Sequence, residues 1–208
     1  MSGSAPVVSY ATEIRRKALH LGALVIPVGI AWAGRPLSVA VLVPLGFLAV
    51  GLDWLRQRNA TAERWLNGAF GGLMRPQERP PPGAPIVLNG ATWMMVGAAL
   101  CAALFEPAVA AVALAMQMIA DAAAALVGRR FGWNRWPRSS KTVEGSVAFA
   151  VAAFAVGGAA IWGLGADIRP LGMMVAAILA AAAEALPIPV DDNLRVPLVA
   201  GATMMLAG

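Results

Sequence analysis

Residues 108–127 read AVAAVALAMQMIADAAAALV, and this stretch decides the fold class of the chain. Its only charged residue is Asp121, Gln117 is its other polar residue, and alanine and aliphatic side chains dominate the rest. About 20 apolar residues in a row match the thickness of a bilayer when they form an α-helix. Alanine favours helix over strand. The stretch therefore predicts a helix that spans a membrane and carries one carboxylate.

The whole chain shares this apolar character. Hydrophobic residues make up 59% of its 208 positions and charged residues only 13%, about half the usual share in a soluble domain. A single water-soluble core would not enclose so much apolar surface. We therefore expect a polytopic, all-α membrane protein that forms one domain over residues 1–208. Cys101 is the only cysteine, which excludes an intramolecular disulfide.

Apolar runs with few charges predict about seven membrane-spanning helices. A turn-like Gly-Arg-Pro sequence at 34–36 separates the first two runs, and Glu-Pro at 106–107 separates the third and fourth. The first run follows basic residues and imitates a signal peptide, but we interpret it as an uncleaved span. The seven runs cover 18–33, 37–52, 86–105, 108–127, 143–164, 171–186 and 194–206.

The positive charges predict the orientation of these spans. With a cytoplasmic N-terminus, all of the 16 Lys and Arg residues except Arg35 and Arg169 fall on the cytoplasmic side. This bias follows the positive-inside rule, so the net charge of +5 does not require nucleic acid as a partner. The cytoplasmic set comprises Arg15, Arg16, Lys17, Arg56, Arg58, Arg64, Arg75, Arg79, Arg129, Arg130, Arg135, Arg138, Lys141 and Arg195.

The longest cytoplasmic loop covers residues 55–85. Apolar side chains recur there at helical spacing, so we expect a short amphipathic helix that lies in the membrane interface. Such a helix would either anchor the connection or guide a substrate, and the pattern favours neither role. A run of prolines at 80–82 ends any helix. The apolar positions are Trp65, Leu66, Ala69, Phe70 and Leu73.

Asp121 is the sharpest candidate for function, because a carboxylate inside a span is costly unless it is paired, hydrated or bound to metal. It lies about six residues, or roughly 9 Å of helix, inside the cytoplasmic end of its predicted span. We interpret it as a metal or nucleotide ligand that faces a cavity; the alternative is a hydrogen bond between helices. His20, the only histidine, would either orient a hydroxyl group or accept its proton; the alternative is that it holds the end of the first span.

The segment 128–146 gathers basic residues, glycines and hydroxyl groups in one cytoplasmic loop. Glycine lets backbone amides approach a phosphate, and Lys and Arg supply charge-assisted hydrogen bonds to it. The glycine–lysine spacing is not that of a Walker A loop. A basic membrane anchor would explain the arginines but not Lys-Thr-x-Glu-Gly-Ser at 141–146, so we expect a nucleotide-binding loop. Its expected binding residues are Gly128, Arg129, Arg130, Lys141, Thr142, Gly145 and Ser146.

A group of oxygen ligands follows the sixth predicted span. Asp192 or Asn193 would suffice to cap the seventh helix, which leaves the other acidic residues unexplained. Carboxylate and amide oxygens are the ligands that Mg²⁺ prefers, so we expect a magnesium site at the cytoplasmic level of the basic loop. This combination suggests phosphoryl or nucleotidyl transfer that involves a lipid. The candidate metal ligands are Asp121, Glu144, Glu184, Asp191, Asp192 and Asn193.

Taken together, these motifs resemble the dolichol kinase and polyprenol kinase family, whose wider group includes phytol kinases and the fungal CTP-dependent diacylglycerol kinase. The resemblance implies a bacterial inner-membrane enzyme that phosphorylates a lipid alcohol, a polyprenol-like or dolichol-like isoprenoid. It further implies CTP as phosphoryl donor, Mg²⁺ as cofactor and an active site that faces the cytoplasm. The matching motifs are Asp121-x₃-Ala125-x₂-Gly128-Arg129-x-Phe131-Gly132, Arg135-Trp136-Pro137, Lys141-Thr142-x-Glu144-Gly145-Ser146, Glu184 with Asp191-Asp192-Asn193-Leu194-x-Val196-Pro197, and Glu13-x-x-Arg16-Lys17-x-x-His20.

The expected catalytic residues are Asp121, Lys141, Glu144 and His20. One alternative is a cytidylyltransferase that forms a CDP-lipid, although the chain lacks the Gly-His-Gly-Gly element and the other C-terminal motifs of CDP-diacylglycerol synthases. A transporter or flippase for an anionic lipid is a third interpretation. It is disfavoured because the outer half offers few polar residues beyond Glu106 and Asp167.

Overall fold

A computed structural model describes residues 10–81, 83–163 and 165–207 of the chain. Within these residues the regular structure is helical, which confirms the all-α class. Short 3₁₀ turns at Gly71–Leu73 and Pro76–Glu78 follow α3, and a π-helical turn at Ala159–Gly163 extends α6. The α-helices are α1 Tyr10–Gly22, α2 Val25–Arg58, α3 Ala60–Phe70, α4 Gly90–Leu104, α5 Pro107–Phe131, α6 Val143–Gly158, α7 Pro170–Ala185 and α8 Asp192–Leu206.

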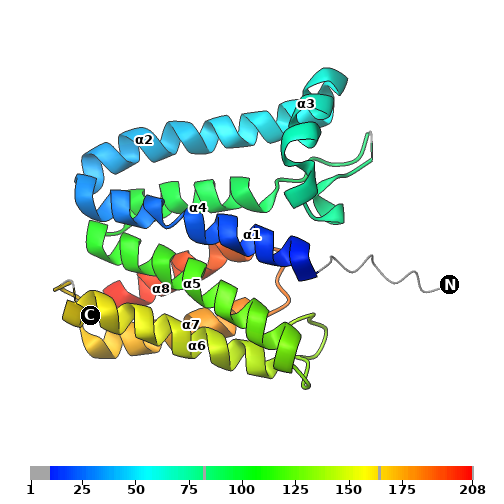
Figure 1. The fold of residues 1–208 in the computed structure, drawn as a ribbon. Coiled ribbons are helices and arrows are strands. Elements are labelled where there is room, and N and C mark those ends of the chain that lie inside the picture. The colour runs from blue at the N-terminus through cyan, green and yellow to red at the C-terminus, as the bar shows by residue number, and fades with distance from the viewer. Residues whose placement is uncertain (1–9, 82, 164, 208) are drawn as a thin grey trace.

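The predicted break after residue 33 lies at Gly34, inside α2. Gly34 has φ 74° and ψ 176°, outside the helical region. Glycine accepts a positive φ because it has no Cβ. Figure 1 shows the chain turn back at this point, so that the two parts of α2 form a hairpin. The first predicted span is also divided, because α1 ends at Gly22 and α2 begins at Val25.

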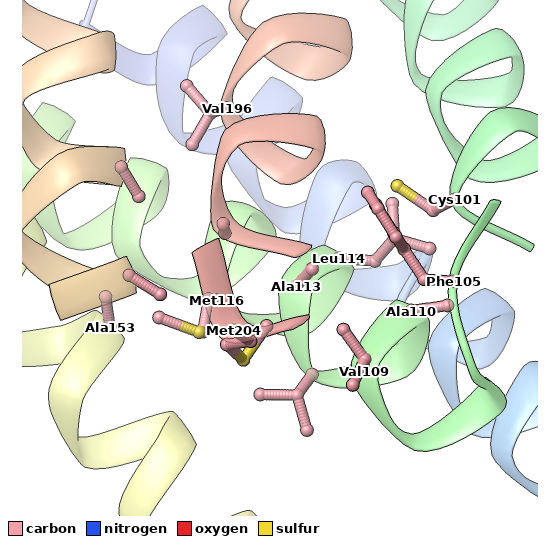
Figure 2. Packing of buried hydrophobic residues seen from close by; sticks show 14 of the residues in the cluster. Cys101, Phe105, Val109, Ala110, Ala113, Leu114, Met116, Ala153, Val196 and Met204 are labelled. Carbon is pink, nitrogen blue, oxygen red and sulfur yellow. The ribbon is translucent and has the colours of Figure 1, made fainter. Parts of the chain in front are cut away.

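α5 forms the centre of the molecule, and it contacts α1, α2, α4, α6 and α8. In the most apolar stretch of α5, 67% of the residues are buried. The corresponding share is 22% in Ile14–Arg58 and 33% in Val143–Gly163. Figure 2 shows Met116 of α5 close to Met204 of α8. Half of the buried residues of α5 are alanines. Small side chains let helices approach closely, as in helix packing within lipid.

Three helical stretches among the described residues are long and apolar enough to cross a membrane: Ile14–Arg58, which joins α1 and α2, Pro107–Phe131, and Val143–Gly163. α4 and α7 are also apolar but shorter. Large apolar side chains remain on the outside, including Trp32 with 87% exposure and Phe47 with 76%. Water would solvate such a surface poorly, whereas lipid tails would cover it. The exposed apolar helices therefore indicate membrane association.

Several helices differ in length from the predicted runs. α2 continues to Arg58, and α4 begins only at Gly90, after Asn89 caps it through the Thr92 backbone N–H. α5 continues to Phe131, so Asp121 lies farther from the helix end than predicted. The short helix predicted in the loop 55–85 is present as α3. In Figure 1 the end that carries α3 also carries the connections from α5 to α6 and from α7 to α8.

Candidate functional site

A cavity of about 440 Å³ lies between α1, α2, α4 and the segment 59–89 that connects α2 with α4. Its lining comprises apolar side chains as well as charged and amide side chains. Its volume is within the range of about 300–1,000 Å³ that is typical of small-molecule sites. The cavity is therefore suited to an amphiphile. The apolar part includes Leu19, Leu52, Leu66, Phe70, Leu73, Met74, Met94 and Met95, and the polar part includes Lys17, His20, Arg75, Asp121 and Asn193.

Asp121 reaches this cavity from α5, and α1 supplies its partners. The Lys17 ammonium donates a hydrogen bond to Oδ2 of Asp121. Nε2 of His20 lies 3.7 Å from the same oxygen, and it is buried without a hydrogen-bond partner among the described residues. Because Lys17 and His20 are three positions apart on a helix, both side chains lie on one face of α1. The structure thus places a cation and a titratable imidazole beside the carboxylate.

Lys17 is 7% exposed and belongs to this site, although our sequence interpretation did not assign it a role. The signal was present in the spacing Arg16-Lys17-x-x-His20. The opening motif also contains Glu13, whose side chain lies outside the described part of the structure.

A second charged cluster surrounds Lys141. Its ammonium donates hydrogen bonds to Glu184 and to Asp192, the latter at 2.8 Å, and Arg195 also donates to Asp192. Burial alone would lower the pKa of Lys141, but the carboxylates of Asp192, Glu184 and Asp121 raise this pKa above its ordinary value. Lys141 is therefore protonated at neutral pH. Because the charge of Asp121 contributes to this rise, Asp121 interacts electrostatically with Lys141.

Asn193 connects the cavity with the start of α8. Its Oδ1 accepts a hydrogen bond from Gln117 at 3.1 Å, and its Nδ2 donates to the Gly90 carbonyl at 3.2 Å. Asp191, rather than Asp192 or Asn193, caps α8 by accepting from the Asn193 backbone N–H at 2.9 Å. Burial raises the pKa of Asp191, and this hydrogen bond opposes the rise. Asp192 is thereby left to face Lys141.

Thr142 and the nearby glycines have packing roles in the predicted nucleotide-binding loop. The Thr142 hydroxyl caps α6 by accepting from the Gly145 backbone N–H at 3.1 Å. A Cβ added to Gly128 would lie 2.8 Å from the Thr142 hydroxyl, and a Cβ added to Gly145 would lie 3.1 Å from the Ala124 carbonyl. The absence of side chains at Gly128 and Gly145 therefore lets α5 and α6 pack closely.

The remaining predicted residues of the loop make local contacts. The Ser146 hydroxyl accepts a hydrogen bond from the Trp136 indole at 3.0 Å. The Glu144 carboxylate accepts from the Asn134 side-chain amide at 2.9 Å and from the Asn134 backbone N–H at 3.2 Å. The structure thus joins Glu144 to the loop rather than to Lys141. Arg129 and Arg130 are exposed near the end of α5.

The six candidate metal ligands are divided among several places. Asp121 bonds to Lys17, Glu184 and Asp192 bond to Lys141, and the other three residues make the contacts described above. Among the described residues, no three His, Cys, Asp or Glu side chains are grouped so that they could hold a metal ion. The magnesium site therefore stays a prediction.

A third polar cluster was not singled out by our sequence interpretation. Asp53, 2% exposed, accepts hydrogen bonds on Oδ1 from Arg56 at 2.9 Å and from the Asn89 side-chain amide at 2.9 Å. On Oδ2 it accepts from the Asn89 backbone N–H at 2.8 Å and from the Thr92 hydroxyl at 2.7 Å. The cluster therefore joins the end of α2 to the start of α4. Its one signal in the sequence was an Asp and an Arg three positions apart, immediately after an apolar run.

Glu78 extends this third cluster into the segment 59–89. Its carboxylate accepts from the Arg75 backbone N–H at 2.9 Å and from the Gly90 backbone N–H at 3.2 Å. Arg56 also donates to the Glu78 carbonyl at 3.1 Å. The buried Glu78 side chain thus fixes the segment against the start of α4.

The fold and the site together define a helical membrane-associated protein with an amphiphilic cavity and two adjoining charged clusters. No family model and no solved structure matches the chain. The chain is 26% identical over 188 residues to a protein of Rickettsia prowazekii (strain Madrid E) described as "Uncharacterized protein RP860". This similarity covers 89% of the present chain and 90% of the Rickettsia protein. It extends over most of both chains, but the description of the Rickettsia protein states no activity. The function of the present chain is therefore inferred from the residues described above.

Proposed function

We propose that the chain is a membrane-embedded kinase that transfers the γ-phosphate of CTP to the hydroxyl group of a polyprenol-like or dolichol-like lipid alcohol. The observation that carries the proposal is the cavity, whose lining combines apolar side chains with Lys17, His20 and Asp121. A lipid alcohol combines the same two properties, with a hydroxyl at the end of a hydrocarbon chain. The resemblance of the sequence motifs to lipid-alcohol kinases points to the same chemistry.

The two charged clusters supply the roles that phosphoryl transfer needs. Asp121 accepts a hydrogen bond from the attacking hydroxyl and orients it, and His20 is placed to receive the proton. A loose transition state demands little deprotonation, so positioning and charge stabilisation dominate the rate. Lys17 and Lys141 stabilise negative charge on the transferred group and on the leaving diphosphate. Their placement near Asp121 supports this assignment.

The donor set at Lys141 fits the predicted Mg²⁺. Glu184 and Asp192 already hold a positive charge between them, and one Glu184 oxygen is buried without a partner among the described residues. Such carboxylate oxygens are ligands that Mg²⁺ prefers. When bound, Mg²⁺ would neutralise charge on the nucleotide phosphates. The residues that would hold it are Glu184 and Asp192.

The proposal includes seven spans, a cytoplasmic N-terminus and a bacterial inner membrane. Its support is the bias of Lys and Arg and the position of the charged clusters at one end of the bundle. Ser139→Cys and Asp167→Cys test the orientation with a membrane-impermeant maleimide, because Cys101 is buried and gives little background. We expect Cys at 167 to react in intact spheroplasts and Cys at 139 only after permeabilisation. The reverse pattern would refute the orientation.

The activity is tested with purified protein in detergent and Mg²⁺, using γ-³²P-labelled CTP or ATP and a panel of alcohols. The panel comprises farnesol, geranylgeraniol, phytol, undecaprenol, dolichol and diacylglycerol. We expect label in a lipid monophosphate, with CTP as the better donor. No labelled lipid from any alcohol, together with pyrophosphate release from CTP and phosphatidate, would instead establish the CDP-lipid alternative.

A further inference from the structure

We infer that the cavity binds the hydroxyl-proximal part of an isoprenoid alcohol, and that the segment 59–89 forms the wall that selects this chain. The inference rests on the proposed function for the chemical class of its ligand. Four side chains of the segment line the cavity: Leu66, Phe70, Leu73 and Met74.

α3 presents one face to the cavity and another face outward. Leu66 and Phe70 are four positions apart, so they lie on the same side of the helix. Leu73 and Met74 continue this apolar wall beyond the end of α3. Trp65, next to Leu66 in the sequence, does not line the cavity and is 78% exposed. α3 therefore separates residues that would contact a bound chain from residues that would not.

A second part of the lining comes from α4 and is rich in methionine. Met94 and Met95 line the cavity there, and α2 contributes Leu52. Methionine is unbranched and flexible, so it adapts to the irregular outline of a branched hydrocarbon. One stiff wall and one adaptable wall suit a methyl-branched isoprenoid chain.

The stiffness of the first wall comes from its attachment at both ends. Gln57 donates to the Val87 carbonyl at 2.8 Å and accepts from the Val87 backbone N–H at 2.9 Å, which joins the two ends of the segment. Asn59 caps α3 through the backbone N–H groups of Thr61 and Ala62. Asp53 and Glu78 add the buried hydrogen bonds described above. Because the wall is held in this way, it would select hydrocarbon chains by their shape and would not adapt to every chain.

The volume limits how much of the alcohol is enclosed. We take ~30 Å³ for each heavy atom, which is the volume per molecule in liquid water. A cavity of about 440 Å³ then holds roughly 15 heavy atoms. This corresponds to about three isoprene units, the length of farnesol. A longer polyprenol would leave the rest of its chain outside the cavity. Affinity should therefore rise with chain length up to farnesol and then level off.

The test uses the full chain, purified in detergent without nucleotide, and a farnesol analogue that carries a diazirine on its hydrocarbon chain, away from the hydroxyl group. We expect the crosslinks, mapped by mass spectrometry, to fall within residues 66–74 and 94–95. Unlabelled geraniol, farnesol, geranylgeraniol and undecaprenol serve as competitors. Geraniol should compete more weakly than farnesol, and the two longer alcohols should compete as well as farnesol.

Leu73→Trp narrows the cavity and should weaken farnesol competition by about tenfold, the effect expected for overpacking a site. Trp65→Ala is the matched control on the outer face of α3 and should leave competition unchanged. Thermal unfolding in detergent verifies that both variants fold. Crosslinks on helices outside the cavity, or loss of competition in Trp65→Ala but not in folded Leu73→Trp, would overturn the inference.

This experiment separates the two proposals because crosslinking requires no phosphoryl transfer. Crosslinks in the cavity with no lipid phosphorylation by any nucleotide would support the chain-binding wall and refute the kinase. Lipid phosphorylation with crosslinks outside the cavity would support the kinase and refute the chain-binding wall.

Discussion

Asp53 and Asp121 line the same cavity, yet their surroundings differ sharply. Asp53 accepts hydrogen bonds on both oxygens from Arg56, Asn89 and Thr92. Asp121 accepts from Lys17 on one oxygen, with the His20 ring nearby. A carboxylate whose lone pairs are used by its own protein stabilises the fold, because removal of any partner leaves a buried charge unpaired. A less saturated carboxylate beside a cation and an imidazole retains the capacity to bind a ligand. The comparison teaches that partners, rather than burial alone, separate structural from functional acids.

Asp121→Asn should have the largest effect on activity. The amide is nearly isosteric but carries no negative charge, so the attacking hydroxyl is left with a weaker, neutral acceptor. We expect lipid phosphorylation to fall by about 10³-fold or more, as for loss of a principal catalytic electrostatic group. The unfolding temperature should fall because the buried Lys17 loses its counter-ion, but by less than in Asp53→Asn, because Asp53 holds more hydrogen-bond partners. The rate of lipid monophosphate formation and the thermal unfolding curve, measured on one preparation, check both parts.

Asp53→Asn should show the opposite pattern. Removal of this charge leaves the buried Arg56 guanidinium without its counter-ion, which should lower the free energy of unfolding by about 3 kcal/mol. The unfolding temperature in detergent should therefore decrease clearly. Asp167→Asn, the same substitution at an exposed position, is the control and should leave the temperature unchanged. Equal stability of the two variants would remove the structural role assigned to Asp53.

Lys141→Met extends the comparison to the second cluster. The change leaves Glu184, which is 3% exposed, without its cation, and it removes a charge from the proposed nucleotide site. We expect activity to fall by about 10²-fold, mainly through weaker use of the nucleotide. Arg138→Met in the same loop removes an exposed cation and should have little effect. A similar loss in both variants would mean that Lys141 acts only as part of a general basic surface.

Glu144→Gln should have the smallest effect of the four, because the Glu144 carboxylate bonds to Asn134 within its own loop. The amide keeps an oxygen acceptor, so activity should fall by less than about tenfold. A titration of activity against Mg²⁺ concentration gives the decisive comparison. A much larger Mg²⁺ requirement in this variant would make Glu144 a metal ligand after all.

The sequence was sufficient to predict those features that depend on local pattern. Apolar runs predicted helices, and the Gly34 and 106–107 breaks lie where the helices turn or end. One end of the bundle gathers His20 with Asp121 and Lys141 with Glu184 and Asp192. The depth of each residue along its helix is enough to place such side chains at one level.

The partners of each side chain were not predictable from the sequence alone. The hydrogen bonds from Asn89 and Thr92 to Asp53 join helices whose relative rotation no periodicity specifies. The close approach at Gly128 likewise depends on how α5 and α6 cross. Glycine and Thr142 were interpreted as phosphate-binding because the motif is compatible with either role. A one-dimensional pattern gives the level of a residue in the bundle, whereas its partner depends on helix packing.

The most direct test of the account compares Asp121→Asn with Asp53→Asn in one lipid phosphorylation assay, with activity expressed per folded protein. The assay uses γ-³²P-labelled CTP, Mg²⁺ and the alcohol that the wild-type protein phosphorylates best. We predict that Asp121→Asn remains folded but forms almost no labelled lipid, and that the folded fraction of Asp53→Asn retains most of its activity. Wild-type levels of labelled lipid from Asp121→Asn would contradict the account.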